Sequence, residues 1–263
     1  MSSIKEKLTN MFSKVMAGTV TREEGTMLIN HLAKEDLEGT VSELASLVET
    51  PPPGVFQKTI LHTIALTRNK AFFNIIVSCL EHKNEDVSIL AAQELSKLKS
   101  AEARETLTAH LDSEAYHVRK ASAAAIAQGF ADGAEILKGH MLRRSEPFYR
   151  LTSAQALVKS GKKGLEALLS VMASGNQGAM TTAAEALVGG SGELEQGDAH
   201  SVFDALMTAG DRKDSHLIIE ILKVVAALKG KASGFEGFVL AFADYPSESV
   251  RKEAQKALQM IRS

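Results

Sequence analysis

The sequence is poor in the residues that several classes of site require. It has no tryptophan, three tyrosines, five prolines and a single cysteine among its 263 residues. One cysteine cannot form a disulfide within the chain, and this fits a reducing compartment, so we expect a cytoplasmic location. The scarcity of large aromatic side chains leaves few platforms on which nucleic-acid bases could stack.

The sequence also has no large excess of positive or negative charge, and it has no long apolar run. The chain has 30 basic and 32 acidic residues, which gives a net charge of −2 and no general attraction to nucleic acids or anionic membranes. No apolar run is long enough for a transmembrane helix or for the core of a secretory signal. The apolar residues near the N-terminus fall at helical spacing, which predicts an amphipathic helix that packs on the rest of the chain.

A nine-residue pattern recurs along the sequence at a nearly fixed interval. Each copy opens on an apolar residue, carries small residues in its second half and closes on a branched aliphatic residue. The first residues of successive copies are 30 to 38 positions apart. The copies cover residues 56–64, 87–95, 118–126, 149–157, 179–187, 217–225 and 250–258.

The segments between these copies have apolar residues at intervals of three or four, which is typical of amphipathic helices. Two helices per repeat of this length predict an all-α fold of the α-solenoid type, in which stacking of the repeats creates the core. No stretch alternates convincingly between apolar and polar residues, so we expect no β-sheet. The predicted partner helices cover 71–83, 101–111, 133–143, 163–174, 197–209 and 232–243.

The same pattern suggests the organisation of the chain. Residues 1–53 are interpreted as an irregular helical cap, which ends at the three prolines of 51–53. Residues 54–263 are predicted to form about seven repeat units in one continuous domain. A glycine-rich insertion near 189–198 explains the longest interval and is expected to be a mobile loop.

Three of the recurring segments carry an arginine directly after the apolar opening residue: 118–126, 149–157 and 250–258. This arrangement resembles the second helix of HEAT repeats, most of all the short bacterial type known as PBS-lyase HEAT-like repeats. The resemblance extends over about residues 55–263. It implies a right-handed α-α superhelix with the second helices on its concave side.

The resemblance also implies roles for individual residues. Arg119, Arg150 and Arg251 are expected to be structural, pairing with an acidic residue in the turn or in the next repeat, with an anion-binding role as the alternative. The side chains expected to line a partner-binding groove are Lys58, His62, Ile89, Leu90, Lys120, Ala121, Leu151, Gln155, Thr181, Glu185, Lys252 and Lys256.

Signs of catalytic or metal chemistry are scarce in the sequence. No histidine is followed by glutamate, whereas the di-iron hydroxylases built from such repeats carry paired His-Glu dipeptides. Cysteines and histidines are not clustered as in zinc sites, and there is no phosphate-binding loop. We therefore expect no catalytic residue, no cofactor and no metal. Cys79 lies among apolar residues and is expected to be buried and inert.

The hypothesis that follows is a non-enzymatic scaffold or adaptor that binds another protein through the concave second-helix surface. The first alternative is a bilin-lyase-like protein that handles a chromophore or a phycobiliprotein, as the repeat type implies. The second is a nucleic-acid binder that uses the basic residues in the middle of the chain. Leu258 and Ile261, if uncovered at the terminal repeat, also suggest self-association.

Overall fold

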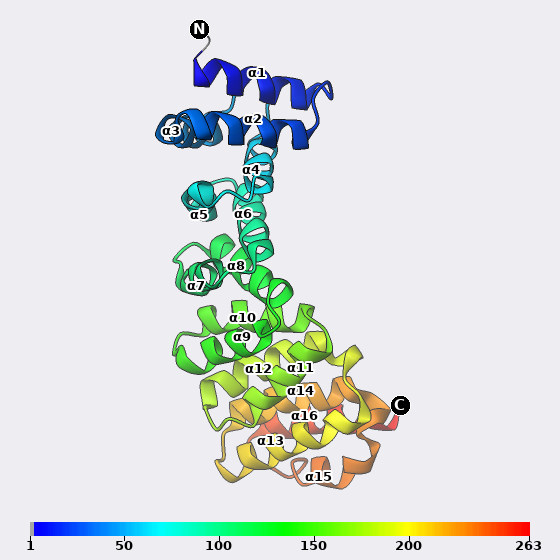
Figure 1. Cartoon of the computed structure of the whole chain (residues 1–263). Helices are drawn as coiled ribbons and strands as arrows, with labels where there is room; N and C mark the ends of the chain where they lie inside the picture. The colour runs from blue at the N-terminus through cyan, green and yellow to red at the C-terminus, as the bar shows by residue number, and fades with distance from the viewer. Residues whose placement is uncertain (1–2) are drawn as a thin grey trace. The chain divides into compact units, whose positions relative to one another are not determined.

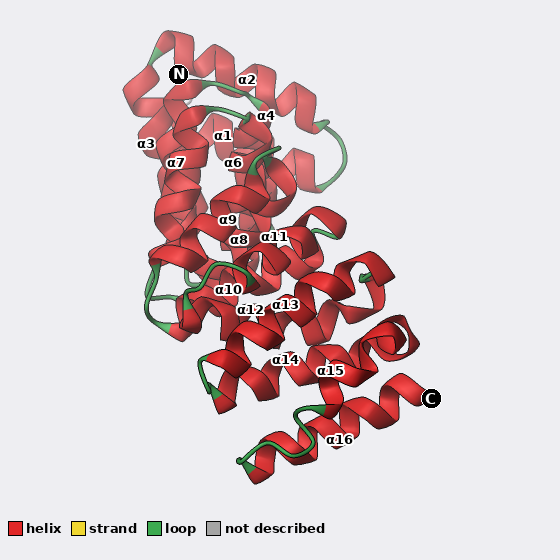
Figure 2. Ribbon diagram, turned by 90° about the horizontal axis from the view of Figure 1, so that it is seen from below, coloured by secondary structure: helices red, strands yellow, loops and turns green. Residues whose placement is uncertain are grey.

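The computed structural model describes residues 3–263, and within that range it contains helices and loops but no strand (Figure 2). The predicted all-α fold is confirmed. The chain divides into two compact units, Met1–Ala125 and Ile126–Ser263. Each unit is a stack of helical hairpins.

The first unit consists of helices joined by turns and loops (Figure 1). Its α-helices are α1 (Ile4–Met16), α2 (Arg22–Glu35), α3 (Leu37–Glu49), α4 (Gln57–Leu66), α5 (Phe73–Ser78), α6 (Glu85–Leu98) and α7 (Ala101–Ala109). Its 3-10 turns are η1 (Lys70–Phe72), η2 (Cys79–Glu81) and η3 (His110–Asp112). Helix α8 (Tyr116–Gly129) contains the boundary between the units.

The N-terminal helices pair more regularly than the sequence suggested. Helix α1 packs on α3 and α2 packs on α4, which in turn packs on α6. The region interpreted as an irregular cap thus continues the hairpin pairing of the later repeats. Leu8 and Phe12 of α1 are fully buried in this stack. Thr21 and Glu24 cap the start of α2 reciprocally, which fixes where that helix begins.

The second unit repeats the helical hairpin. Its α-helices are α9 (Gly133–Arg143), α10 (Pro147–Lys159), α11 (Lys162–Met172), α12 (Gln177–Gly190), α13 (Ala199–Asp211), α14 (Ser215–Leu228), α15 (Glu236–Leu240) and α16 (Glu248–Arg262). Its 3-10 turns are η4 (Ser191–Glu193), η5 (Gln196–Asp198) and η6 (Lys229–Phe235).

In this unit the second helices α10, α12, α14 and α16 pack side by side in chain order, and α9, α11 and α13 do the same (Figure 1). The substantial contacts of each helix are with its own hairpin and with the adjacent hairpins. Such nearest-neighbour packing defines an α-solenoid. Across residues 3–263, none of the helices has the length and hydropathy needed to span a membrane.

The glycine-rich insertion contains two 3-10 turns. Helix α12 runs through Gly190, and η4 and η5 then lead into α13. Leu194 between these turns is buried, and Lys231 Nζ donates to its carbonyl oxygen at 2.6 Å. A buried leucine and a lysine from the following turn thus contact the segment, and its mobility stays a prediction.

The C-terminal repeat also differs from the expectation. Leu258 and Ile261 of α16 are buried, because α16 packs on α14, α15 and η6. The apolar residues that suggested an uncovered end are therefore covered within the chain. They give no support to self-association through this repeat.

Candidate functional site

The second helices leave a strip of accessible side chains in each unit, which we call the second-helix face. It comprises the accessible side chains of α4, α6 and residues 116–125 of α8 in the first unit, and of α10, α12, α14 and α16 in the second. The predicted groove residues found exposed are Lys58, Ile89, Lys120, Leu151, Gln155, Glu185, Lys252 and Lys256. His62, Leu90 and Thr181 are half-buried.

Ala121 is the exception among the predicted groove residues. It is only 5% exposed, whereas its neighbour Lys120 is exposed. Successive residues of a helix point about 100° apart, so one residue can face solvent while the next packs against the stack. Ala121 therefore offers no surface to a partner.

The sequence pattern also predicts that the opening residue of the first recurring segment faces inward, and the structure shows otherwise. Phe56 is 67% exposed, whereas the neighbouring Val55 is buried. Phe56 is the N-cap residue of α4 and lies outside the helix, so its side chain does not follow the inward-facing stripe. Two open hollows, of about 520 and 510 Å³, flank it; both are lined by Phe56 and Thr59, one also by Lys58 and the other by Met16.

Buried carboxylates lie on the second helices beside this face. In the first unit, Glu94 of α6 is more than nine-tenths buried. His62 Nδ1 lies 3.0 Å from its Oε1, and Lys97 Nζ donates to the same oxygen at 2.7 Å. The histidine and the lysine thus satisfy a charge that would be costly to bury alone.

The second unit repeats the pairing of a carboxylate with a lysine three residues later. Lys223 Nζ donates to Glu220 Oε1 on α14 at 2.7 Å, and Lys256 Nζ donates to Glu253 Oε2 on α16 at 3.0 Å. Glu220 is 7% exposed. Both glutamates occupy the fourth place of the recurring segment, where earlier copies carry small or apolar residues. Sequence reasoning named Lys256 but missed Glu220 and Lys223, although this departure from the pattern was a usable signal.

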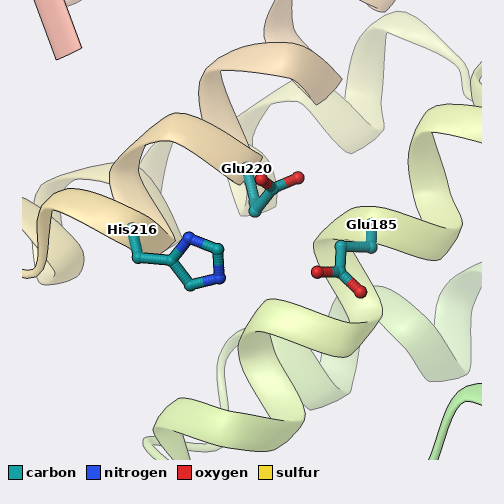
Figure 3. Close-up of side chains that lie close together, drawn as sticks. All are labelled: Glu185, His216 and Glu220. Atoms are coloured by element: carbon teal, nitrogen blue, oxygen red, sulfur yellow. The ribbon is translucent and has the colours of Figure 1, made fainter. Parts of the chain in front are cut away.

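Two adjacent second helices bring a histidine and two carboxylates together (Figure 3). His216 and Glu220 are four residues apart on α14, and Glu185 extends from α12. One ligand atom from each of the three lies within 4.8 Å of the others. Glu185 was predicted as a groove residue, whereas His216 was missed. Its spacing of four residues from Glu220 was a usable signal, but Glu185 is distant in sequence. Side chains of these types can hold a metal ion.

The three repeat arginines anchor the turns that precede their helices. Arg119 Nη1 donates to the carbonyl oxygens of Ser113 and Glu114, at 2.7 and 2.9 Å. Arg251 Nη1 donates in the same way to Tyr245 and Pro246, at 2.8 and 2.9 Å. These contacts go to main-chain oxygens five or six residues earlier, where the sequence suggested acidic side chains.

Arg150 performs the same task and adds a bond to the next repeat. Its Nη1 donates to the carbonyl oxygen of Arg144 at 3.0 Å, and its Nε donates to Thr182 Oγ1 at 3.3 Å. Arg119 and Arg150 are both buried. Their guanidinium groups hold the fold together and are not presented to solvent anions.

Cys79 lies in η2 with almost no exposed surface. Burial, and to a smaller extent the charge of Glu49, raise the pKa of its thiol to about 11. Because the thiolate is the reactive form, this cysteine is unsuited to nucleophilic or redox chemistry near neutral pH.

Comparison with known proteins agrees with this architecture. Residues 41–127 match the family model of HEAT repeats. The match begins inside α3, which the sequence analysis had assigned to the cap. HEAT repeats are therefore shown for this third of the chain. No curated protein sequence matches it.

Solved structures of similar proteins share low sequence identity with the chain. Human deoxyhypusine hydroxylase, solved in complex with glycerol, is 14% identical, with 98% of this chain and 97% of that chain covered and a TM-score of 0.41. The archaeal HEAT-like repeats protein from Thermococcus onnurineus NA1 is 14% identical over 84% of this chain and 97% of that one, with a TM-score of 0.44.

The karyopherin Kap121p, bound to the extreme C-terminus of the protein phosphatase Cdc14p, is a third similar structure. It is 14% identical, with 98% of this chain but 32% of Kap121p covered and a TM-score of 0.46. The chain thus corresponds in length to about a third of the karyopherin.

Proposed function

We propose that the chain is a non-enzymatic scaffold that binds a partner protein through its second-helix face. The observation that supports this most is the exposure of aliphatic side chains there. Leu151 on α10 is 37% exposed and Ile89 on α6 is 38% exposed. In each unit these residues have charged or amide side chains near them, such as Gln155 one turn from Leu151. Apolar anchors surrounded by polar groups are typical of protein interfaces.

The kind of partner follows from the shape of a helical stack. Successive second helices present their accessible residues in parallel rows, and this suits a helix or an extended segment laid across them. In the second unit these rows carry both signs of charge, with Glu185 on α12 and Lys252 and Lys256 on α16. We expect the partner segment to combine an aliphatic residue with charged residues of both signs.

Nucleic-acid binding is less well supported by the side chains themselves. Two of the basic residues on which that alternative depended, Arg119 and Arg150, are buried and donate to turn carbonyls. They are therefore not available to contact phosphates. No particular residue of the chain favours bilin chemistry, so chromophore handling stays a prediction of the repeat type alone.

The proposal is tested by capture of the partner with single-residue variants of the tagged chain. Leu151→Asp places a charge on the second-helix face of the second unit, and Met207→Asp is its matched control on the first helix α13. Met207 is exposed to a similar degree. Ile89→Asp and Leu37→Asp, the latter at the start of α3, form the corresponding pair in the first unit.

We expect a partner that is retained by wild type and by both controls, and lost with Leu151→Asp or Ile89→Asp. Far-ultraviolet circular dichroism checks that each variant keeps its helices. Equal capture by all variants would contradict the proposal. Loss confined to Met207→Asp or Leu37→Asp would move the interface to the first helices.

A further inference from the structure

Glu185, His216 and Glu220 meet on the second-helix face without bonding to one another. One donor atom of each lies within 4.8 Å of the others. Nevertheless, among the described residues the side chains of Glu185 and His216 form no hydrogen bond and no ion pair. The three side chains approach a common space from α12 and α14 (Figure 3). We propose that they form a binding site for a single Zn²⁺ ion, independently of the scaffold function.

The spacing of the donor atoms is compatible with a metal site. Zinc binds imidazole nitrogen and carboxylate oxygen at about 2.0–2.2 Å in a tetrahedral arrangement, so its ligand atoms lie roughly 3.3 Å apart. Small rotations of the exposed Glu185 and His216 side chains bring the donors from their present separations to that distance. Both helices can remain in place during this adjustment.

The surroundings also favour a cation at this point. Glu185 and Glu220 are two carboxylates beside an imidazole, and Glu220 is nearly buried. Lys223 donates to Oε1 of Glu220, which leaves acceptor capacity on the same carboxylate. The two carboxylates of Glu185 and Glu220 thus have one positive charge beside them, that of Lys223. A divalent ion placed among the donors offsets the remaining repulsion between the two carboxylates.

The group formed by Glu94, His62 and Lys97 in the first unit resembles the proposed zinc site and shows how the two differ. His62 Nδ1 and Lys97 Nζ are both at hydrogen-bonding distance from Glu94 Oε1, at 3.0 and 2.7 Å. That group has one carboxylate, and its imidazole is already engaged by it. The group at Glu220 has a second carboxylate from the neighbouring helix and an imidazole with no bond. His62 is therefore a matched control for His216.

Three protein ligands leave the fourth position of a tetrahedral zinc ion open. In zinc sites with three protein ligands, a water molecule or a substrate occupies the fourth position. Since the site lies on the second-helix face, a carboxylate, imidazole or thiolate from a bound molecule can reach it. The metal would then be accessible from solvent.

The experiment is a calorimetric titration of the purified full-length chain with a zinc salt. We expect one Zn²⁺ per chain for wild type and for His62→Ala. The variants His216→Ala and Glu185→Gln each remove one ligand from an exposed position, so the fold is expected to persist. Their affinity should fall by more than about 100-fold, since even the loss of an outer-shell partner weakens metal binding about 10- to 100-fold.

A second readout is thermal unfolding with and without zinc. An ion bound to the native state alone raises the midpoint, so zinc should raise it for wild type and His62→Ala but not for His216→Ala. The absence of saturable binding to wild type would overturn the proposal. Undiminished binding by His216→Ala would overturn it equally, because the ion would then be held by other residues.

Discussion

Arg150 on α10 donates from Nε to the hydroxyl oxygen of Thr182 on α12, 3.3 Å away. The same guanidinium donates to the carbonyl oxygen of Arg144 in the turn before α10, at 3.0 Å. One side chain therefore ties its own turn to the following repeat. Because Arg150 is buried, these bonds replace the water that its charge would otherwise require.

Replacing Arg150 by alanine should destabilise the second unit. The change leaves the Arg144 carbonyl and the Thr182 hydroxyl without their charged donor, and we expect a loss of about 2–4 kcal/mol in the free energy of unfolding. Urea denaturation followed by circular dichroism measures it. Arg143→Ala, at an exposed position next to the turn, is the control and should change stability little. Equal effects of the two variants would refute the anchoring role.

Two glycines of the second unit allow successive helices to touch. A Cβ atom on Gly164 at the start of α11 would collide with the carbonyl oxygen of Leu157, and one on Gly133 at the start of α9 would collide with that of Ile126. Gly164→Ala should therefore destabilise the chain by about 1–3 kcal/mol, the usual range for overpacking.

Gly139 in the middle of α9 is the matched control for Gly164. A Cβ atom there approaches one atom of the Arg143 side chain, at 3.3 Å, which can move aside. Gly139→Ala is expected to stabilise the chain by about 0.5–1 kcal/mol, because alanine favours helix over glycine. Opposite signs in thermal or urea unfolding are the predicted result. A stabilising Gly164→Ala would show that the close approach has been overestimated.

Cys79 should resist modification while the chain is folded. Its thiol is buried and has a pKa of about 11, so very little thiolate exists at pH 8. Reaction with a thiol reagent should be slow in buffer and rapid in urea. Fast modification of the native chain would contradict the burial of this side chain.

The same thiol makes stability depend on pH in the alkaline range. The unfolded chain releases this proton near pH 8.5, whereas the folded chain retains it until about pH 11. The native state therefore binds more protons in between, and the free energy of unfolding should decrease as the pH rises through that window. Cys79→Ala should weaken this dependence, as measured by denaturation at several pH values.

Lys213 has a left-handed backbone conformation, with φ of +55°. This region is costly for residues with a Cβ atom and free of that cost for glycine. Lys213→Gly should therefore stabilise the chain by about 0.5–1 kcal/mol, since the relief exceeds the greater entropy of the unfolded glycine. Lys120→Gly, within α8, should cost about 1 kcal/mol. Thermal unfolding of both variants tests the contrast, and a destabilising Lys213→Gly would count against it.

The sequence alone determined the second helices and most of their partner helices. The partner helices predicted over 71–83 and 232–243 are instead the short helices α5 and α15 with adjoining 3-10 turns. The nine-residue copies coincide with the second helices from α4 to α16, because a repeat that cannot bury its apolar face alone must carry the same inward stripe in every unit. The arginines at 119, 150 and 251 share one slot, and Arg119 and Arg251 bond the turn before their helix in the same way. Local spacing is sufficient for such features because they lie within a few residues of each other.

Other features were decided by the tertiary structure. The exposure of Phe56 depends on α4 beginning one residue later. The contact of the insertion with the following turn depends on Lys231 reaching Leu194. The meeting of Glu185 with His216 and Glu220 depends on the register between α12 and α14. A nine-residue pattern fixes which face of a helix is buried. It does not fix how far one helix is shifted along the next, and that shift decides which accessible side chains come together.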